Sequence, residues 1–237
     1  MIGLGTLINV AGIVVGGLLG LAGGRFLTTQ IQDAIMKSTA VCVIFVGIAG
    51  AIEQMMSVHG AGLTSGGTAR IVISMAGGAL IGELLGIERG VERFGSWLKR
   101  VTGNGGDATF VNAFVTASLT VCIGAMAVVG SIQDGLTGAW GTLALKGALD
   151  LLIICVMTAS LGRGCIFSAI PVGLCEGAMT LAASALQPLM TDAAINSLAM
   201  VGSILIFCVG VNLIWERTFR VANMLPALLI AVALAYL

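Results

Sequence analysis

Long apolar stretches, separated by short glycine-containing or charged connections, follow one another along the whole chain. A helix that crosses a bilayer needs about 20 mostly apolar residues. Eight stretches approach this length, at roughly 3–23, 38–57, 69–88, 110–132, 142–162, 165–187, 193–214 and 219–236. The pattern predicts an all-α polytopic membrane protein with about eight transmembrane helices in one domain, residues 1–237. Because Pro171 lies inside the sixth stretch, seven helices with a re-entrant segment at 165–187 are the alternative.

Basic residues gather in the odd-numbered connections between these stretches. If all eight cross the membrane, nine of the 11 Lys and Arg residues fall on one side, and only Arg70 and Lys146 fall on the other. By the positive-inside rule, the richer side is cytoplasmic and both termini lie outside. Residues 89–103 mix basic and large apolar side chains, which predicts an amphipathic helix on the inner membrane surface. Residues 25–37 resemble a shorter version, and a solvated loop is the alternative for each.

Glycine recurs at every fourth position in two of the stretches. The two rows share a constant offset and consist of Gly12, Gly16, Gly20 and Gly24, and of Gly78, Gly82, Gly86 and Gly90. The run VCVIFVGIAGAIEQ from Val41 likewise corresponds to VCIGAMAVVGSIQD from Val121. We therefore predict a duplicated two-helix unit at about 5–57 and 67–136, with a weaker third copy at 141–216. Glycine rows let helices pack closely, within one chain or between subunits of a homo-oligomer, most simply a dimer.

Composition agrees with a membrane protein and narrows its chemistry. The chain is 58% hydrophobic and 9% charged, with a mean hydropathy of +1.09, whereas soluble domains are roughly 25% charged. A formal net charge of zero gives no electrostatic basis for binding nucleic acid. The six cysteines lie in apolar runs without a CxxC spacing, which favours packing over a disulfide or metal set. His59 is the single histidine, so no metal site is expected.

Ionisable residues inside the apolar stretches are the candidates for function. They are Glu83, Lys146, Asp150 and Glu176. A charge at the bilayer centre costs at least about 2.5–3.5 kcal/mol, so such residues face the bundle interior and need partners. Lys146 and Asp150 stand four residues apart and can pair on one helix face. One or two of the acids are then left without a basic partner.

A buried carboxyl group without a basic partner can bind a proton, or Na⁺ with the help of amide oxygens. The asparagines that could assist are Asn9 and Asn212. Lys146, with its neighbouring acid, could also contact an anionic or zwitterionic solute. The alternative is permanent pairing that only holds helices together, for Glu83 with Lys146 or Arg70. A second polar group, Glu53 with Gln133 and Asp134, is expected at an outer mouth that attracts cations, or as solvated helix ends.

Several motifs together resemble a family of uncharacterised bacterial inner-membrane proteins typified by YqgA and YdfK. They are INVAGIVVGGLLG from Ile8, GALIGELLG from Gly78, GSIQDGLTG from Gly130, LALKGALD from Leu143, SAIPVGL from Ser168 and ANMLPALLIA from Ala222. The resemblance covers essentially the whole chain. It implies a polytopic protein of the inner membrane and gives no established activity.

These observations lead us to expect a secondary transporter of a small solute or ion, coupled to H⁺ or Na⁺ through intramembrane carboxylates. The alternatives are a channel-like oligomer, and a structural or partner-binding membrane protein. An enzyme is not expected, because the chain has no HExxH or GxSxG motif and no histidine in an apolar stretch. No cofactor is expected beyond the coupling ion, and the expected partners are the lipid bilayer, the solute and a second copy of the chain.

Overall fold

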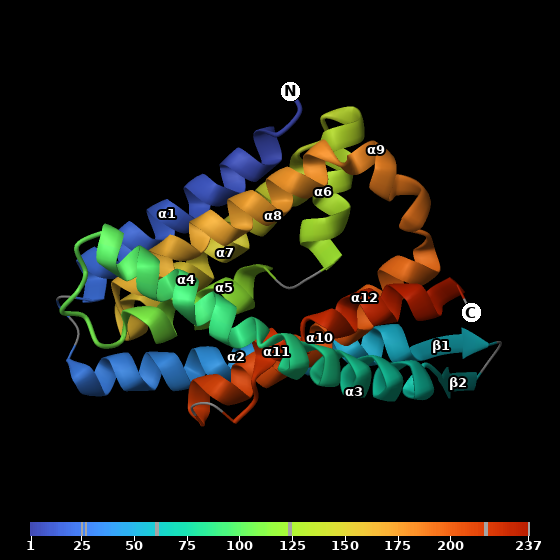
Figure 1. Cartoon of the computed structure of the whole chain (residues 1–237), viewed down its shortest axis with the longest axis horizontal. Coiled ribbons are helices and arrows are strands. Elements are labelled where there is room, and N and C mark those ends of the chain that lie inside the picture. The colour runs from blue at the N-terminus through green and yellow to red at the C-terminus, as the bar shows by residue number, and fades with distance from the viewer. Residues whose placement is uncertain (25, 27, 60–61, 123–124, 216–217, 237) are drawn as a thin grey trace. The chain divides into compact units, whose positions relative to one another are not determined.

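The structure is a computed structural model that describes residues 1–24, 26, 28–59, 62–122, 125–215 and 218–236. Almost all of its elements are helices, which confirms the all-α fold class (Figure 1). Arg25 and Arg217 are two of the nine basic residues counted on the cytoplasmic side, and both lie outside the described residues.

Helices follow the apolar stretches closely. The longer ones are α1 (Leu4–Gly24), α2 (Thr29–Met55), α3 (Thr68–Leu85), α4 (Ile87–Val101), α5 (Phe110–Cys122), α6 (Ala125–Thr137), α7 (Gly141–Leu161), α8 (Ala169–Leu181) and α10 (Asp192–Ile214). The shorter ones are α9 (Ala183–Leu186), α11 (Val221–Met224), α12 (Pro226–Ala233) and the 3₁₀ helices η1 (Arg163–Ser168), η2 (Gln187–Leu189) and η3 (Leu234–Tyr236). An antiparallel hairpin of β1 (Met56–His59) and β2 (Gly62–Ser65) was not among the predicted elements.

Among the described residues, six helices are long and apolar enough to cross a membrane. A seventh span results if α5 and α6, which are bent by 63° relative to each other, cross together. The last predicted stretch forms only a shorter apolar helix, Val221–Tyr236, so the count is lower than the expected eight. The segment Arg163–Leu181 is among the six. Pro171 lies in the first turn of α8, where its missing N–H removes no bond that the helix needs.

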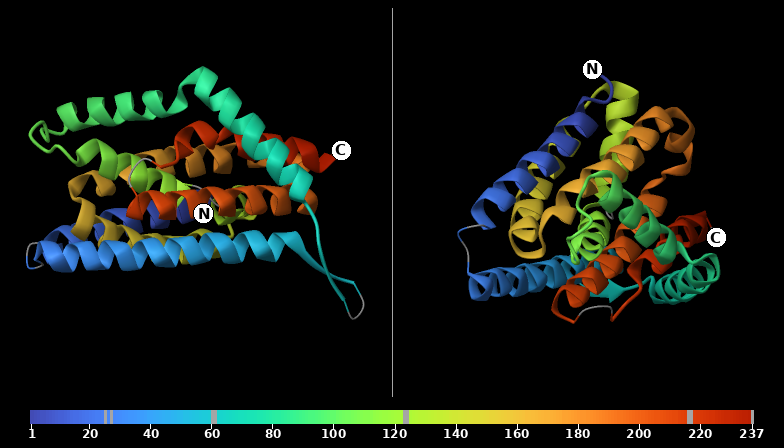
Figure 2. Two further views of the ribbon diagram at one scale, coloured as in Figure 1. Left: turned by 90° about the horizontal axis from the view of Figure 1, so that it is seen from below. Right: turned by 60° about the vertical axis from the view of Figure 1, so that its left-hand side comes forward.

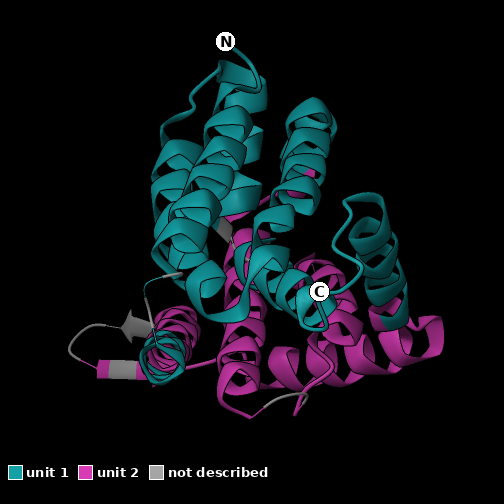
Figure 3. Ribbon diagram, turned by 90° about the vertical axis from the view of Figure 1, so that its left-hand side faces the viewer, with its two compact units in different colours: residues 1–39, 89–122, 126–188 teal, residues 40–88, 123–125, 189–237 magenta. Residues whose placement is uncertain are grey.

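The chain divides into two compact units, each built from segments that are distant in the sequence (Figure 3). The first unit contains residues 1–39, 89–122 and 126–188, and the second contains residues 40–88, 123–125 and 189–237. In the first unit α1 lies along α7 and also contacts α8 and η1, an arrangement that Figure 2 shows from two more sides. In the second unit α3 packs against α10, α11 and α12. The predicted sequence duplication stays a prediction.

The glycine row of α1 faces the backbone of α7. Each glycine meets one carbonyl group: Gly12 meets Gly147, Gly16 meets Leu151, and Gly20 meets Cys155. A Cβ atom added at Gly12 would lie 2.6 Å from the carbonyl oxygen opposite, so a side chain there requires the helices to separate. The matching four-residue steps on both helices mean that α1 and α7 run parallel. This row therefore brings two backbones together inside one chain.

The second glycine row packs against another backbone only over part of its length. Gly78 and Gly82 face the backbones of Ala227 and Asn223 in the second unit. Gly86, expected to continue the row, instead ends α3 with a φ of 62° and an N–H bond to the Gly82 carbonyl. A residue in this left-handed conformation stops the helix, and glycine adopts it without a steric cost.

The amphipathic stretch predicted at 89–103 forms helix α4. Its Leu98 is buried in a cluster with Phe110 and Phe114 of α5, while Trp97 is 52% exposed. The apolar face of α4 is thus divided between the protein core and the surroundings, which is compatible with the expected position at the membrane surface. The other amphipathic stretch, 25–37, is mostly the first part of α2 rather than a separate element.

Candidate functional site

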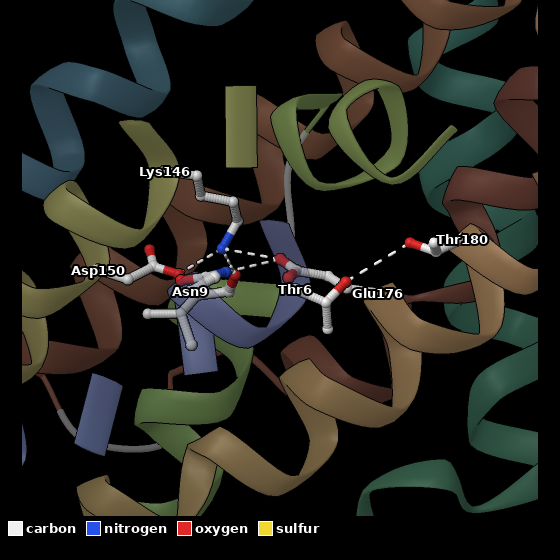
Figure 4. A network of polar contacts seen from close by, with 7 residues as sticks. Thr6, Asn9, Lys146, Asp150, Glu176 and Thr180 are labelled. Carbon is white, nitrogen blue, oxygen red and sulfur yellow. Dashed lines mark hydrogen bonds and ion pairs between the residues drawn. The ribbon is translucent and has the colours of Figure 1, made fainter. Parts of the chain in front are cut away.

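A buried polar network lies where α1, α7 and α8 meet in the first unit (Figure 4). α1 contributes Asn9, α7 contributes Lys146 and Asp150, and α8 contributes Glu176. All four residues are at most 6% exposed. Three segments that are long and apolar enough to cross a membrane, Leu4–Gly24, Gly141–Leu161 and Arg163–Leu181, therefore place polar side chains on one shared inner surface.

Lys146 is the centre of the network. Its ammonium group donates to Asp150 Oδ2, lies 3.4 Å from Glu176 Oε1, and donates to the carbonyl oxygen of Val121 at 2.9 Å. An ammonium group has three N–H donors. Among the described residues Lys146 thus contacts two carboxyl groups and one backbone carbonyl, and its expected contact with a solute stays a prediction.

Local sequence explains how α7 meets α1 at this point. Lys146 and Asp150 share a helix face because they are four residues apart. Between them, Gly147 lies so close to α1 that an added Cβ would be 2.9 Å from the Cα of Asn9. Without a side chain at Gly147, the amide of Asn9 can reach the charged groups.

Asn9 connects α1 to the acid on α8. Its Nδ2 donates to Glu176 Oε1 at 2.7 Å. One turn away on both helices, the hydroxyl oxygens of Thr6 and Thr180 are 3.5 Å apart. The remaining amide and carboxylate oxygens, Asn9 Oδ1 and Glu176 Oε2, are buried and have no hydrogen-bond partner among the described residues. A buried acceptor without a donor is costly, so these two oxygens are the unsatisfied positions of the network.

The charges of the network do not balance. Asp150 and Glu176 are two carboxyl groups, and Lys146 is the single basic side chain that contacts them in the described structure. With all three groups ionised, the network carries one net negative charge in a buried place. One bound proton or one monovalent cation neutralises it.

Glu83, also a predicted ion site, has a different environment. It lies in the second unit, where Arg220 NH1 contacts both carboxylate oxygens at 3.3 and 3.0 Å. The side chain of Glu83 is 46% exposed. Arg220 is thus a partner of Glu83 that the sequence did not suggest, since it offered Lys146 or Arg70. Arg70 instead donates to the hydroxyl of Ser197 at 2.8 Å.

Asn212, predicted to assist ion binding, is occupied by the backbone. Its Nδ2 donates to the carbonyl of Phe219 at 2.7 Å, and its Oδ1 accepts from the N–H of the same residue at 2.9 Å. Both polar atoms of the amide are therefore used to hold the connection after α10. The structure does not bring Asn212 into the network of the first unit.

The three residues predicted at an outer mouth differ in burial. Glu53 is exposed in the second unit, and the exposed Gln133 accepts a hydrogen bond from the Thr142 hydroxyl at 2.8 Å. Asp134 is completely buried, and its Oδ2 accepts from the N–H of Gly5 in the first turn of α1 at 3.0 Å. A carboxylate at a helix N-terminus is stabilised by the helix dipole. The burial of Asp134 agrees neither with an exposed outer mouth nor with a solvated helix end, the two interpretations that the sequence suggested.

Sequence reasoning missed Thr6, Thr180 and Arg220. A signal for the two threonines exists, since Thr180 is one turn after Glu176 and Thr6 is one turn before Asn9. Arg220 has no local signal, because it is 137 residues from Glu83. Among the described residues, no group of three or more His, Cys, Asp and Glu side chains can hold a metal ion, and the six cysteines are free.

Several apolar helices of spanning length with buried charges on their inner faces define a multi-pass membrane protein. The chain belongs to the family described as Protein of unknown function (DUF554), whose model matches residues 4–236. It is 26% identical to the uncharacterized membrane protein YdfK of Bacillus subtilis (strain 168) over 226 residues, 95% of this chain and 93% of YdfK. It is 25% identical to the uncharacterized protein YqgA of Escherichia coli (strain K12) over 236 residues, 98% of this chain and 96% of YqgA. No solved structure matches the chain.

Proposed function

We propose that this protein is a secondary transporter in which the network of Asn9, Lys146, Asp150 and Glu176 binds the coupling ion, H⁺ or Na⁺. The observation that supports the proposal is the charge imbalance: two buried carboxyl groups contact one lysine. A network that served only to join helices would be expected to balance its charges, because an uncompensated buried charge is expensive.

Glu176 is the residue we assign to the ion. One of its oxygens contacts Asn9 and Lys146, whereas Oε2 is buried and has no hydrogen-bond partner in the described part of the chain. A proton can add at Oε2, and Na⁺ can lie between Oε2 and the equally unpartnered Asn9 Oδ1, both of which are hard oxygen ligands. Asp150 remains the partner of the lysine in either case.

The network also joins three helices, which gives ion binding a route to conformational change. Neutralising Glu176 weakens its attraction to Lys146 and thereby loosens α8 from α7. Transporters commonly hold their ions near the membrane centre between such helices. The solute, the coupling ion, the inner-membrane location with outside termini and the homo-oligomeric state all belong to this proposal, as does the absence of an enzymatic activity.

The test is the thermal stability of the purified full-length protein across pH, with Na⁺ or with K⁺ at equal ionic strength. A ligand that binds the native state raises its stability by mass action. We expect the wild type to become more stable either as the proton concentration rises or as Na⁺ replaces K⁺. Glu176→Gln keeps an acceptor for Asn9 but cannot bind the ion, so this response is lost.

Glu83→Gln is the matched control, because it removes a carboxylate that is half exposed and paired outside the network. It should keep the wild-type response. An identical ion and pH response in the wild type and in Glu176→Gln would refute the coupling role and leave a structural role for the network.

A further inference from the structure

A second polar region of the first unit is a cavity of about 830 Å³ at the C-terminal ends of α1 and α7. Its wall is formed by these two helices, by η1 and by residues from the connection between α4 and α5. Along α1, Asn9 of the network precedes Leu18, the first cavity residue of that helix, by two and a half turns, roughly 13 Å at the rise of an α-helix. The cavity is therefore distinct from the ion site.

Apolar side chains lie between the two places. Ile13 on α1 and Ile154 on α7 are completely buried, and Met157 is 2% exposed. Along its helix, each of these residues lies between the network residue and the first residue that lines the cavity. A solute in the cavity is thus separated from the network by packed side chains.

Lys146 already contacts two carboxyl groups and a backbone carbonyl, which favours another site for the solute of the proposed transporter. The cavity offers one, because two of its described lining residues are charged and opposite in sign, Arg163 and Asp107. Arg163 is exposed and has no ion-pair partner among the described residues. Its guanidinium group is available to an acid group, which it can bind through two parallel hydrogen bonds.

Asp107 is fixed in position by its neighbour Thr109. Its Oδ1 accepts from the backbone N–H of Thr109 at 2.9 Å and from the hydroxyl of Thr109 at 2.8 Å. The other oxygen, Oδ2, lies 4.0 Å from the position of a Cβ at Gly162, the residue before Arg163. Asp107 thus lies close to the backbone that leads into Arg163, and both residues line the cavity. The nearby Leu18, Ile166 and Phe167 add apolar surface.

We propose that this cavity binds a small zwitterionic solute, with its acid group on Arg163 and its ammonium group on Asp107. The inference rests on the proposed transport function and names the solute class for it. Arg163 begins the segment Arg163–Leu181, and Glu176 lies on the same segment. The proposed solute site and the proposed ion site therefore lie at different positions along the same helical segment.

Binding is tested by the thermal shift of the purified full-length protein in detergent. The probes are L-alanine, L-leucine and γ-aminobutyrate, each compared with the carboxylate and the amine of similar size that lack the second charge. We expect at least one zwitterion to raise the melting temperature more than its two singly charged relatives. Arg163→Gln should weaken the binding of that zwitterion at least about tenfold.

Asp107→Asn tests the recognition of the solute's ammonium group separately from that of its acid group. Asparagine keeps an oxygen that can accept from Thr109, so the connection should retain its structure. We expect the zwitterion to bind this variant no better than the matching carboxylate. Arg93→Gln is the control, because Arg93 is an exposed arginine of α4 outside the cavity lining, and it should bind like the wild type.

The inference is overturned if no zwitterion stabilises the wild type, if the carboxylates stabilise it equally well, or if Arg93→Gln loses the effect as Arg163→Gln does. Stabilisation by phosphatidylethanolamine alone would assign the cavity to a lipid headgroup and would also overturn it. The ion response of the wild type and Glu176→Gln is measured without these probes. The coupling proposal can thus stand when the solute assignment fails, and the reverse also holds.

Discussion

Replacing Lys146 by methionine tests how strongly the buried network depends on its single cation. Methionine is similar in length and apolar, so it removes the charge while filling most of the space. The two carboxyl groups then face each other without an ammonium group between them. The lysine side chain is 7% exposed, so water cannot take its place.

The distance between Lys146 and Glu176 gives the size of the expected loss of stability. Over the 3.4 Å between Lys146 and Glu176, the Coulomb attraction is about 5 kcal/mol at an effective dielectric constant of roughly 20. Part of this energy offsets the cost of burying the charges, and breaking a buried ion pair typically costs 3–5 kcal/mol net. For a chain of this size we expect the melting temperature to fall by roughly 10 °C.

The chain contains a close control for this substitution. Lys37 and Asp33 form the same type of pair, four residues apart on a helix, at 2.7 Å. The lysine side chain there is 61% exposed, and exposed pairs contribute at most about 1 kcal/mol. Lys37→Met should therefore change the melting temperature by no more than a few degrees. Equal losses of stability in Lys146→Met and Lys37→Met, measured by thermal unfolding in detergent, would refute the argument from burial.

Further substitutions test single contacts through the same unfolding measurement. Gly16→Ala places a methyl group against a backbone carbonyl of α7, so we expect a loss of at least about 2 kcal/mol. Gly23→Ala on the same helix meets nothing within 4 Å and should be neutral or stabilising by up to about 1 kcal/mol; equal effects would contradict close packing. Gly86→Ala strains the left-handed end of α3 and should cost roughly 1 kcal/mol, and no loss would mean that α3 can end differently. Asp134→Asn removes the charge that α6 places next to the N-terminus of α1, and this should cost about 1 kcal/mol. Glu53→Gln, at an exposed position, should cost less, and the reverse order would contradict the helix-dipole argument.

The apolar pattern determined most of the helices, because burial in a membrane requires long apolar segments with internal hydrogen bonding. The amphipathic helix α4 and the pairing of Lys146 with Asp150 followed for the same kind of reason. Both depend on spacing within one helix, where the helical period alone decides which side chains share a face. The apolar pattern did not determine the number of spans, since the bend between α5 and α6 and the short last helix depend on packing.

Partners that lie far apart in the sequence were decided only by the tertiary structure. The sequence showed that one or two acids lacked a basic partner, but not that Glu176 would join Lys146 while Glu83 met Arg220. It likewise placed Asp134 at an outer mouth, whereas docking against the start of α1 buries it completely. Composition and periodicity fix what each helix must bury, but which helices meet depends on how their surfaces fit. For this protein the glycine row of α1 sets that fit, because it admits the backbone of α7 and so brings Asn9 to the charged groups.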